Sequence, residues 1–340
     1  MVAISPRRTP SRAAGNGKRT PTMSREAFAT EFDGIVANVE KVIKGKTDQI
    51  RLVLVAMIGD GHVLLEDMPG TGKTMMARAI AQSIDATVNR IQCTPDLLPS
   101  DVTGAPVLDV RNGTFTFREG PVFANVLLVD EINRATPKTQ SALLEAMQEH
   151  SITVAGVRHQ LAEPFCVIAT QNPIETEGTY PLPEAQLDRF LMKVTVGFPQ
   201  LEVLRSIGVS TTGVSTASAE RVMSREELLG MQRLVRQIVV APHVADVAAH
   251  ITMATHPEHN MSPARVKKFV RFGASPRAMQ ALLLAGRANA LLAGRAHVGV
   301  EDLRAIATPV LRHRMILGFD ATLDGVTADS LVADVLATIQ

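Results

Sequence analysis

The residues best suited to chemistry are a lysine and a threonine that follow a glycine-rich turn. Residues 66–74 (EDMPGTGKT) come after the apolar run 62–65 and lead into 75–81, where small and apolar residues alternate at helical spacing. This order predicts a strand, a phosphate loop and a helix. Backbone N–H groups and the positive end of the helix would bind a phosphate chain, while Lys73 neutralises its charge and Thr74 ligates Mg²⁺. A nucleoside triphosphate is the expected ligand.

One position of this loop departs from the usual pattern, G-x-x-x-x-G-K-[ST]. The chain has Asp67 five positions before Gly72, where the pattern has glycine. That position lies where the strand turns outward, and aspartate adopts turn conformations by bonding to nearby backbone. The alternative is a strand-to-helix turn without a ligand. The candidate nucleotide-binding residues are Asp67, Met68, Pro69, Gly70, Thr71, Gly72, Lys73 and Thr74.

Two acids after a second apolar run form the next candidate group. Residues 126–129 (VLLV) are too few for a buried helix, and they end at Asp130 and Glu131. The pattern predicts a central parallel strand, and ligands of such sheets gather at the carboxyl ends of the strands. We therefore expect Asp130 to hold Mg²⁺, usually through water, and Glu131 to polarise the attacking water. A solvated turn is the alternative.

A third predicted strand, 165–170, delivers Asn172 to the same edge of the sheet. This side chain is expected to orient the attacking water and to sense the γ-phosphate. Taken alone, an asparagine before a proline is more often a turn former. Its predicted role therefore depends on its position after the strand.

Longer runs of sequence resemble the MoxR family of AAA+ ATPases, and the similarity spans about residues 28–319. The runs that carry the resemblance are 90–101 (RIQCTPDLLPSD), 130–135 (DEINRA), 138–149 (KTQSALLEAMQE) and 178–189 (GTYPLPEAQLDR). The resemblance implies an α/β fold, the AAA+ P-loop NTPase, with a five-stranded parallel sheet, flanking helices and a small all-α lid domain. It also implies rings, commonly hexamers, with ATP bound between neighbours.

Two arginines match family positions that complete the ATP site. Arg189 matches the arginine finger, which the next subunit would supply to the transferring phosphoryl group. The alternative for Arg189 is a surface arginine paired with Asp188. Arg277 matches the second sensor of the lid. Ser275 is a good N-cap, which places Arg277 in a first helical turn where a cation is disfavoured, so a nearby anion is expected; ordinary solvent exposure is the alternative.

The sequence also predicts how the chain is divided. Asn112-Gly113 and Ala155-Gly156 each lie between alternating segments and predict two hairpins. The resemblance implies that both project towards the axis or face of the ring, where substrates are engaged; the alternative is that they only cap the sheet. The predicted units are a disordered basic tail (1–22), the AAA+ core (23–200, with a helix-2 insert at about 103–118 and a second hairpin at about 151–161), a linker (201–222) and the helical lid (223–340).

Composition favours a cytoplasmic enzyme. The chain has 340 residues, 46% of them apolar, a net charge of +1 and two cysteines, Cys93 and Cys166, which we expect to be buried and reduced. No apolar run is long enough to span a membrane. The tail lacks the apolar segment of a secretory signal, and a solvated tail is favoured over a transit peptide or a nucleic-acid-binding arm. A basic cluster at 265–271 is interpreted as a solvated helix face, because one tyrosine and no tryptophan leave little for base stacking.

The expected function is Mg²⁺-dependent ATP hydrolysis. By resemblance, the energy would serve chaperone-like remodelling or maturation of client proteins, with partners that carry a von Willebrand factor A domain. The alternative is a nucleotide-gated assembly switch that hydrolysis only resets. A nucleic-acid motor is less favoured because the net charge is near zero.

Overall fold

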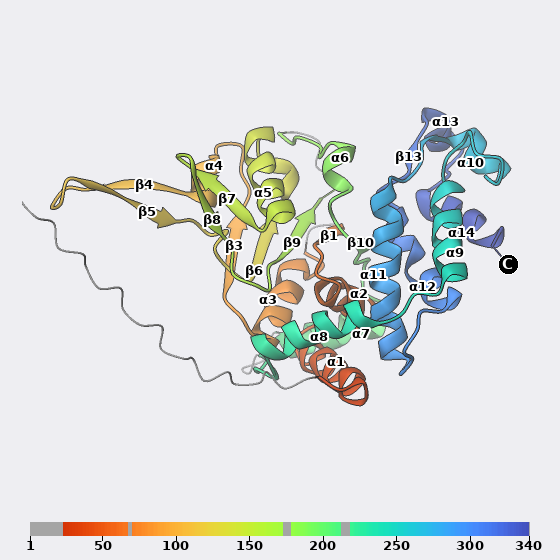
Figure 1. Cartoon of the computed structure of the whole chain (residues 1–340), viewed down its shortest axis with the longest axis horizontal. Coiled ribbons are helices and arrows are strands. Elements are labelled where there is room, and N and C mark those ends of the chain that lie inside the picture. Colours follow the sequence, from red (N-terminus) through yellow and green to blue (C-terminus); the bar gives the residue numbers. More distant parts are fainter. Residues whose placement is uncertain (1–22, 67–69, 173–177, 212–217, 340) are drawn as a thin grey trace, which may run out of the picture.

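A five-stranded parallel sheet lies at the centre of the fold (Figure 1). The computed structural model describes residues 23–66, 70–172, 178–211 and 218–339. The strands, in their spatial order, are β10 (Met192–Thr195), β1 (Val63–Glu66), β9 (Cys166–Gln171), β6 (Val126–Asp130) and β3 (Val88–Gln92). All four pairings are parallel. The predicted sheet is confirmed, and the three strands expected from the apolar runs are its three interior members.

Alternation along the strands explains why both faces of the sheet are covered. In β1, Val63 and Leu65 join one hydrophobic cluster while Leu64 joins the other. Helices α1 (Arg25–Glu40), α2 (Thr47–Ile58) and α3 (Lys73–Ser83) contribute to the first cluster, and α5 (Pro137–Glu149) contributes to the second. Because the strands are parallel, their carboxyl ends lie at the same edge of the sheet. The loops after β1, β3, β6 and β9 therefore meet at this edge.

Both predicted hairpins are present and project from the same side of the sheet (Figure 1). The second, β7 (Ser151–Val154) with β8 (Val157–Gln160), turns at Ala155 and Gly156, both with positive φ. The first, β4 (Gly104–Asp109) with β5 (Thr114–Glu119), follows the short helix α4 (Pro99–Thr103) and has a four-residue loop. This loop differs from a two-residue Asn-Gly turn because the Asp109 carboxylate accepts hydrogen bonds from the Arg111 N–H and the Asn112 side chain.

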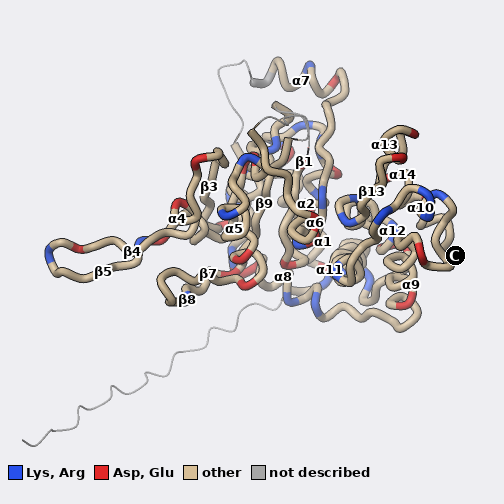
Figure 2. The backbone as a smooth tube through the Cα atoms, turned by 90° about the horizontal axis from the view of Figure 1, so that it is seen from above, with Lys and Arg blue, Asp and Glu red and all other residues tan. Residues whose placement is uncertain are grey.

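The segment predicted as a linker, 201–222, begins with a helix, α7 (Leu201–Thr211). Figure 2 shows α7 at the periphery of the molecule. The linker was predicted from the composition of residues 208–218. In the structure, residues 208–211 of that stretch form the last turn of α7. The apolar residues of α7 face the core, since Leu204 and Ile207 line one cavity with Val42 and Ile43 and a Cβ on Gly45 would lie 2.7 Å from the Val203 side chain. The tail, 1–22, lies outside the described residues.

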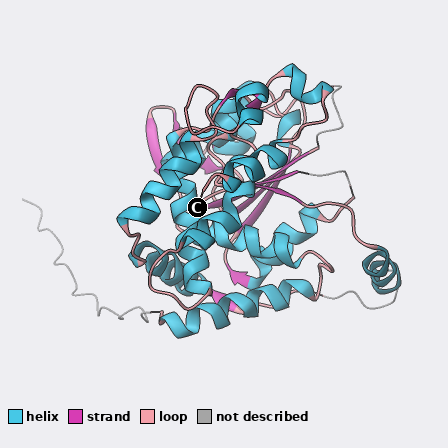
Figure 3. Cartoon of the chain, turned by 90° about the vertical axis from the view of Figure 1, so that its right-hand side faces the viewer, coloured by secondary structure: helices cyan, strands magenta, loops and turns pink. Residues whose placement is uncertain are grey.

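The C-terminal part is a group of helices (Figure 3). They are α8 (Arg225–Gln237), α9 (Pro242–Met253), α10 (Ala264–Phe269), α11 (Pro276–Leu292), α12 (Val300–Leu311), α13 (Phe319–Leu323) and α14 (Ala328–Ala337). A capping box starts α8, where Ser224 and Glu227 bond to each other's backbone N–H. The lid is not wholly helical, because β12 (Val270–Phe272) pairs with β13 (Ile316–Leu317).

One hydrophobic cluster joins the sheet to the lid helices. It runs from β1 and α2 through α8 and α11 to α12 without interruption. The lid therefore packs directly on the core instead of being held only by a linker. No helix among the described residues is long and apolar enough to cross a membrane.

Candidate functional site

The phosphate loop leads directly into helix α3, as the sequence predicts. Gly70 and Gly72 have φ of 82° and 87°, a backbone conformation that residues with a Cβ rarely adopt. A Cβ on either glycine would meet no atom within 4 Å, so backbone conformation and not crowding requires glycine here. Helix α3 begins at Lys73, with its N-terminal backbone groups at the loop. The candidate residues Asp67, Met68 and Pro69 lie outside the described residues.

Asp130 lies at the end of β6, beside Thr74. The Thr74 hydroxyl donates to Asp130 Oδ1 over 3.0 Å, and the Thr170 hydroxyl at the end of β9 lies 3.3 Å from the same oxygen. The Asp130 side chain is 5% exposed, so it can act as a ligand only toward the loop. Two hard oxygen donors close together fit a Mg²⁺ ion. The predicted pair of metal ligands is therefore adjacent in the fold.

Glu131 occupies a constrained position directly after β6. Its φ is 55°, in the left-handed region, and its N–H donates to the Thr170 hydroxyl over 2.9 Å. The Glu131 carboxylate accepts hydrogen bonds from Gln92 over 3.2 Å and from Arg134 over 3.0 Å, both at Oε2. Non-glycine residues in this conformation persist where surrounding contacts enforce them, often at functional sites. The contacts hold the carboxylate at the phosphate-loop cavity.

Arg90 is a site residue that the sequence reasoning missed. It lies on β3, and its Nε donates to Asp130 Oδ2 over 2.7 Å, while its Nη2 donates to Gln92 over 3.1 Å. Arg90 thereby links the candidate metal ligand to the residue that contacts Glu131. Its position in the first family-like run, 90–101, was the available signal, but only the pairing of β3 with β6 identifies its partner.

These residues line one cavity of about 360 Å³. Its lining includes Gly70, Thr71, Gly72, Lys73, Thr74, Arg90, Asp130, Glu131 and Asn172. Asn172, at the end of β9, is 4% exposed, and its carbonyl oxygen accepts a hydrogen bond from Asn133 over 3.4 Å. The cavity thus collects the loop, both acids and the predicted sensor from three strands and one helix. A lysine, two carboxylates and an amide around an anion-binding turn suit phosphoryl transfer to water.

The buried thiol beside this cavity is not a nucleophile. The Cys93 N–H donates to the Asp130 carbonyl, and the side chain is fully buried. Burial and the nearby carboxylates of Asp130 and Glu131 raise the pKa of the Cys93 thiol to about 12. Cys93 therefore stays protonated at neutral pH. Both cysteines are free and buried, as expected.

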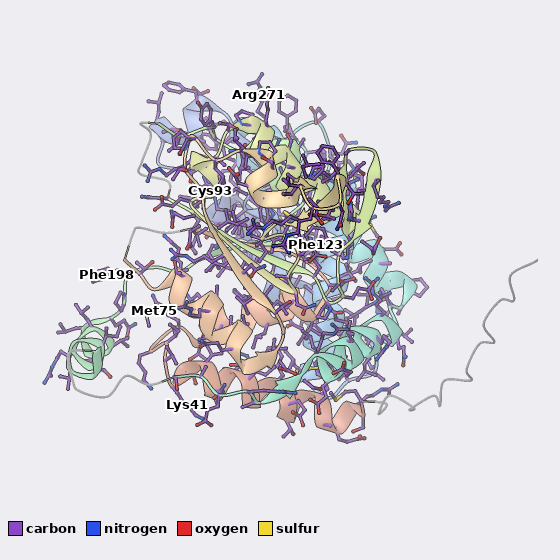
Figure 4. The ribbon with its side chains drawn as sticks, turned by 90° about the vertical axis from the view of Figure 1, so that its left-hand side faces the viewer. Lys41, Met75, Cys93, Phe123, Phe198 and Arg271 are labelled. Carbon is purple, nitrogen blue, oxygen red and sulfur yellow. The ribbon has the colours of Figure 1, made fainter. Side chains whose placement is uncertain are left out.

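A second cavity of about 220 Å³ shares Gly70, Thr71 and Gly72 with the first, and the sequence reasoning did not predict it. Its walls are mostly apolar and include Val42, Ile43, Met75, Phe198, Leu204 and Ile207. Met75 and Phe198 lie on the same side of the molecule (Figure 4). The buried Lys46 ammonium donates to the Val196 and Gly197 carbonyls over 2.7 and 2.5 Å. These hydrogen bonds fix the backbone between the end of β10 and Phe198. An apolar slot next to a phosphate site suits a planar base.

The two predicted arginines lie together, away from the phosphate loop of this chain. Arg189 and Arg277 line a separate cavity of about 170 Å³ that contains no phosphate-loop residue. Arg189 Nη1 donates to the Leu144 carbonyl over 2.8 Å. The alternative pairing of Arg189 with Asp188 is wrong, because the Asp188 carboxylate contacts Arg277 and Arg314 instead. Arg277 lies in the first turn of α11, with its Nη1 3.8 Å from the Asp188 carboxylate and its side chain 43% exposed, so it has both a nearby anion and the solvent exposure given as the alternative.

Comparison with known proteins agrees with this arrangement. A family model described as "ATPase family associated with various cellular activities (AAA)" matches residues 62–192, and a model described as "AAA lid domain" matches 262–335. Chaperone MoxR1 of Mycobacterium tuberculosis is 39% identical over 330 residues, which cover 96% of this chain and 87% of that protein. The chain belongs to the MoxR family of AAA+ ATPases.

Other relatives are similar over nearly the same length. The uncharacterized protein YeaC of Bacillus subtilis is 44% identical over 308 residues, covering 90% of this chain and 93% of the relative. Protein MoxR of Paracoccus denitrificans is 32% identical over 303 residues, covering 84% and 88%. A crystal structure of an ATPase candidate from Cytophaga hutchinsonii superimposes with a TM-score of 0.86 at 32% identity, covering 93% of this chain and 96% of that one.

Proposed function

We propose that this MoxR-family protein hydrolyses ATP by attack of water on the γ-phosphate. The observation that carries the proposal is the single cavity that joins Lys73 and Thr74 to Asp130, Glu131 and Asn172. In this assignment Lys73 binds the phosphate chain, Glu131 takes the proton of the attacking water and Asn172 orients that water.

Thr74 and Asp130 would hold Mg²⁺. Their side-chain oxygens are 3.0 Å apart and face the phosphate loop, which fits a hard cation bound to a phosphate chain. The bound ion would neutralise charge that develops on the phosphate oxygens. Arg90 holds the other oxygen of Asp130, which leaves Oδ1 for the metal side.

The apolar cavity between Met75 and Phe198 would hold adenine. It adjoins the phosphate loop through Gly70, Thr71 and Gly72, so one ligand can occupy both cavities. Apolar walls favour a flat aromatic base over a water-filled slot. Helix α7 contributes Leu204 and Ile207, which gives this peripheral helix a role in nucleotide binding.

Arg189 and Arg277 would act on the nucleotide of a neighbouring subunit. Both line a cavity that lacks phosphate-loop residues, and an arginine without a phosphate partner in its own chain suits delivery across an interface. Repetition of such a head-to-tail contact closes a ring. We propose a homo-oligomeric ring, most simply a hexamer, located in the cytoplasm.

Shared sites make the rate per subunit depend on protein concentration. We expect wild-type ATP turnover per subunit to rise with concentration until assembly is complete. Arg189→Ala should lose turnover while each chain still binds nucleotide, whereas Arg233→Ala, which changes an exposed arginine on α8, should behave as wild type. Turnover per subunit that stays constant down to the monomer would refute the shared site.

The biological role that we propose is chaperone-like remodelling or maturation of client proteins, with a von Willebrand factor A domain protein as partner. The name of one relative, Chaperone MoxR1, supports this role. A nucleotide-gated assembly switch is the second candidate. A nucleic-acid motor is less favoured, because two of the basic residues at 265–271 are ion-paired within the lid: Arg265 with Asp334 and Lys268 with Asp324.

Trapping the ATP-bound state separates these roles. The Glu131→Gln protein, recovered from its native cells with ATP, should carry a defined protein client that is absent without ATP. Co-purified nucleic acid would favour the motor, and no ATP-dependent partner would favour the switch. Stimulation of wild-type turnover by the captured protein would then support remodelling.

A further inference from the structure

Asp188 joins the ATPase core to the lid directly beside Arg189. Its Oδ1 accepts a hydrogen bond from Arg314 Nε over 2.9 Å, and its Oδ2 accepts one from the Ser275 hydroxyl over 2.7 Å. Arg277 Nη1 lies 3.8 Å from the same Oδ2. Three lid residues therefore meet on one carboxylate of the core, which is 16% exposed.

Arg314 extends this contact along the backbone around Arg189. Its Nη2 donates to the carbonyls of Asp188 and Phe190 over 3.0 and 2.7 Å, and its Nη1 donates to the Leu191 carbonyl over 3.2 Å. The Arg314 side chain is 2% exposed. A buried guanidinium with this many fixed partners holds the carbonyls on both sides of Arg189 in one geometry.

The two residues before Arg314 bind Phe190 and Thr195, the last residue of β10. His313 Nε2 donates to the Phe190 carbonyl over 3.0 Å, and Arg312 Nη1 donates to the Thr195 hydroxyl over 2.8 Å. The segment after α12 thus follows the core chain from Asp188 to Thr195. These hydrogen bonds tie the backbone around Arg189 to the lid.

We propose that Asp188 and Arg314 are positioning residues that set Arg189 and Arg277 together for the nucleotide of the neighbouring subunit. The inference rests on the shared site proposed above. Asp188 holds the start of α11 through the Ser275 hydroxyl, lies within ion-pair distance of Arg277 at Oδ2, and fixes the backbone of Arg189 through Arg314. A lid movement therefore carries both arginines, and loss of the carboxylate releases them from each other.

The direct test is Asp188→Asn, which keeps the side-chain shape and removes the charge. We expect nucleotide affinity and KM to stay within about twofold while kcat falls at least about tenfold, because the chain's own phosphate loop is untouched and only the delivered arginines are displaced. Asp188→Glu, which restores the charge, should recover part of the loss in kcat.

Mixed assemblies show in which subunit the defect acts. Glu131→Gln subunits have an inactive site but intact arginines, so they should rescue a neighbouring Asp188→Asn site. With random mixing at equal amounts, half of the sites are competent and half of their neighbours supply intact arginines, which gives about one quarter of wild-type turnover. A mixture no more active than the mean of its two components would overturn the inference.

A parallel mixture separates this inference from the proposed shared site. Arg189→Ala mixed with Glu131→Gln should recover activity by the same argument. If neither mixture recovers, the shared site itself fails. If only the Arg189→Ala mixture recovers, Asp188 does not position the arginines.

Two further variants test whether a lower kcat arises only from a general loss of core–lid stability. Asp60→Asn removes the carboxylate partner of a different core-to-lid arginine, Arg236 at 2.8 Å, and should leave kcat unchanged because Asp60 is far along the chain from Arg189. Ser275→Gly deletes one hydrogen bond to Asp188 and retains an acceptable N-cap for α11, so it should lower kcat in the same direction as Asp188→Asn but by less. An equal loss of kcat in Asp60→Asn would mean that any weakened core–lid contact suffices, which would also overturn the inference.

Discussion

Replacing Glu131 with glutamine should separate ATP binding from ATP hydrolysis. Glutamine has the same length, and its side-chain oxygen can still accept the hydrogen bonds from Gln92 and Arg134. What it loses is the ability to take a proton from water. A positioned general base contributes about 10²–10⁴-fold to a rate, so kcat should fall at least about a hundredfold, or about 2.7 kcal/mol in the barrier.

The cost to folding should be much smaller than this loss. The Glu131–Arg134 ion pair has side chains 30% and 41% exposed, and such pairs contribute about 0–1 kcal/mol. The left-handed φ of residue 131 is present in both proteins and cancels in the comparison. A hundredfold rate loss therefore cannot arise from partial unfolding of the variant.

The assay measures steady-state ATP turnover, nucleotide affinity and urea unfolding on the same preparations. Glu149→Gln is the matched control, since Glu149 forms an exposed ion pair with Arg158 on the second hairpin and should show the same small change in stability with unchanged turnover. Turnover of Glu131→Gln within about threefold of wild type would refute the assignment of Glu131 as the base. So would a rate loss matched by an equal loss of nucleotide affinity.

Three further predictions follow from particular contacts. Phe198→Ala should weaken ATP binding about tenfold but leave tripolyphosphate binding unchanged in competition assays, because Phe198 lines the proposed base cavity and is not among the residues that line the phosphate-loop cavity. Burial lowers the pKa of His62 from 6.5 to about 4, so the protonated form is disfavoured in the folded state. The contribution of His62 to the free energy of unfolding should therefore fall by about 3 kcal/mol as the pH drops from 6.5 to 4. Urea unfolding should show a shallower pH dependence for His62→Gln but not for His243→Gln, which changes an exposed histidine. Gly104→Ala should abolish amide protection in the β4–β5 hairpin in hydrogen-exchange measurements, since its Cβ would lie 2.2 Å from the Arg118 carbonyl, whereas Gly34→Ala on open helix surface should not.

Local sequence determined the phosphate loop, the strands and the two acids. A short apolar run that ends in acids specifies a buried strand with its ligands at the carboxyl end, and parallel pairing then brings such ends to one edge. That reasoning predicted Thr74 and Asp130 as ligands of one metal ion, and in the structure the Thr74 hydroxyl donates to Asp130 Oδ1 over 3.0 Å. The second hairpin was equally local, because Ala155-Gly156 sets its own turn.

Tertiary structure alone decided which arginine side chain pairs with which carboxylate. Arg90 reaches Asp130 only because β3 pairs with β6, and Arg314 reaches Asp188 across 126 positions of the chain. The proposed base cavity likewise combines residues from three separate segments, 42–46, 70–75 and 198–207, and the last of these includes a helix that composition had predicted as a linker. Periodicity and turn chemistry report the conformation of a few neighbouring residues, whereas a buried guanidinium finds its partner through the packing of whole elements.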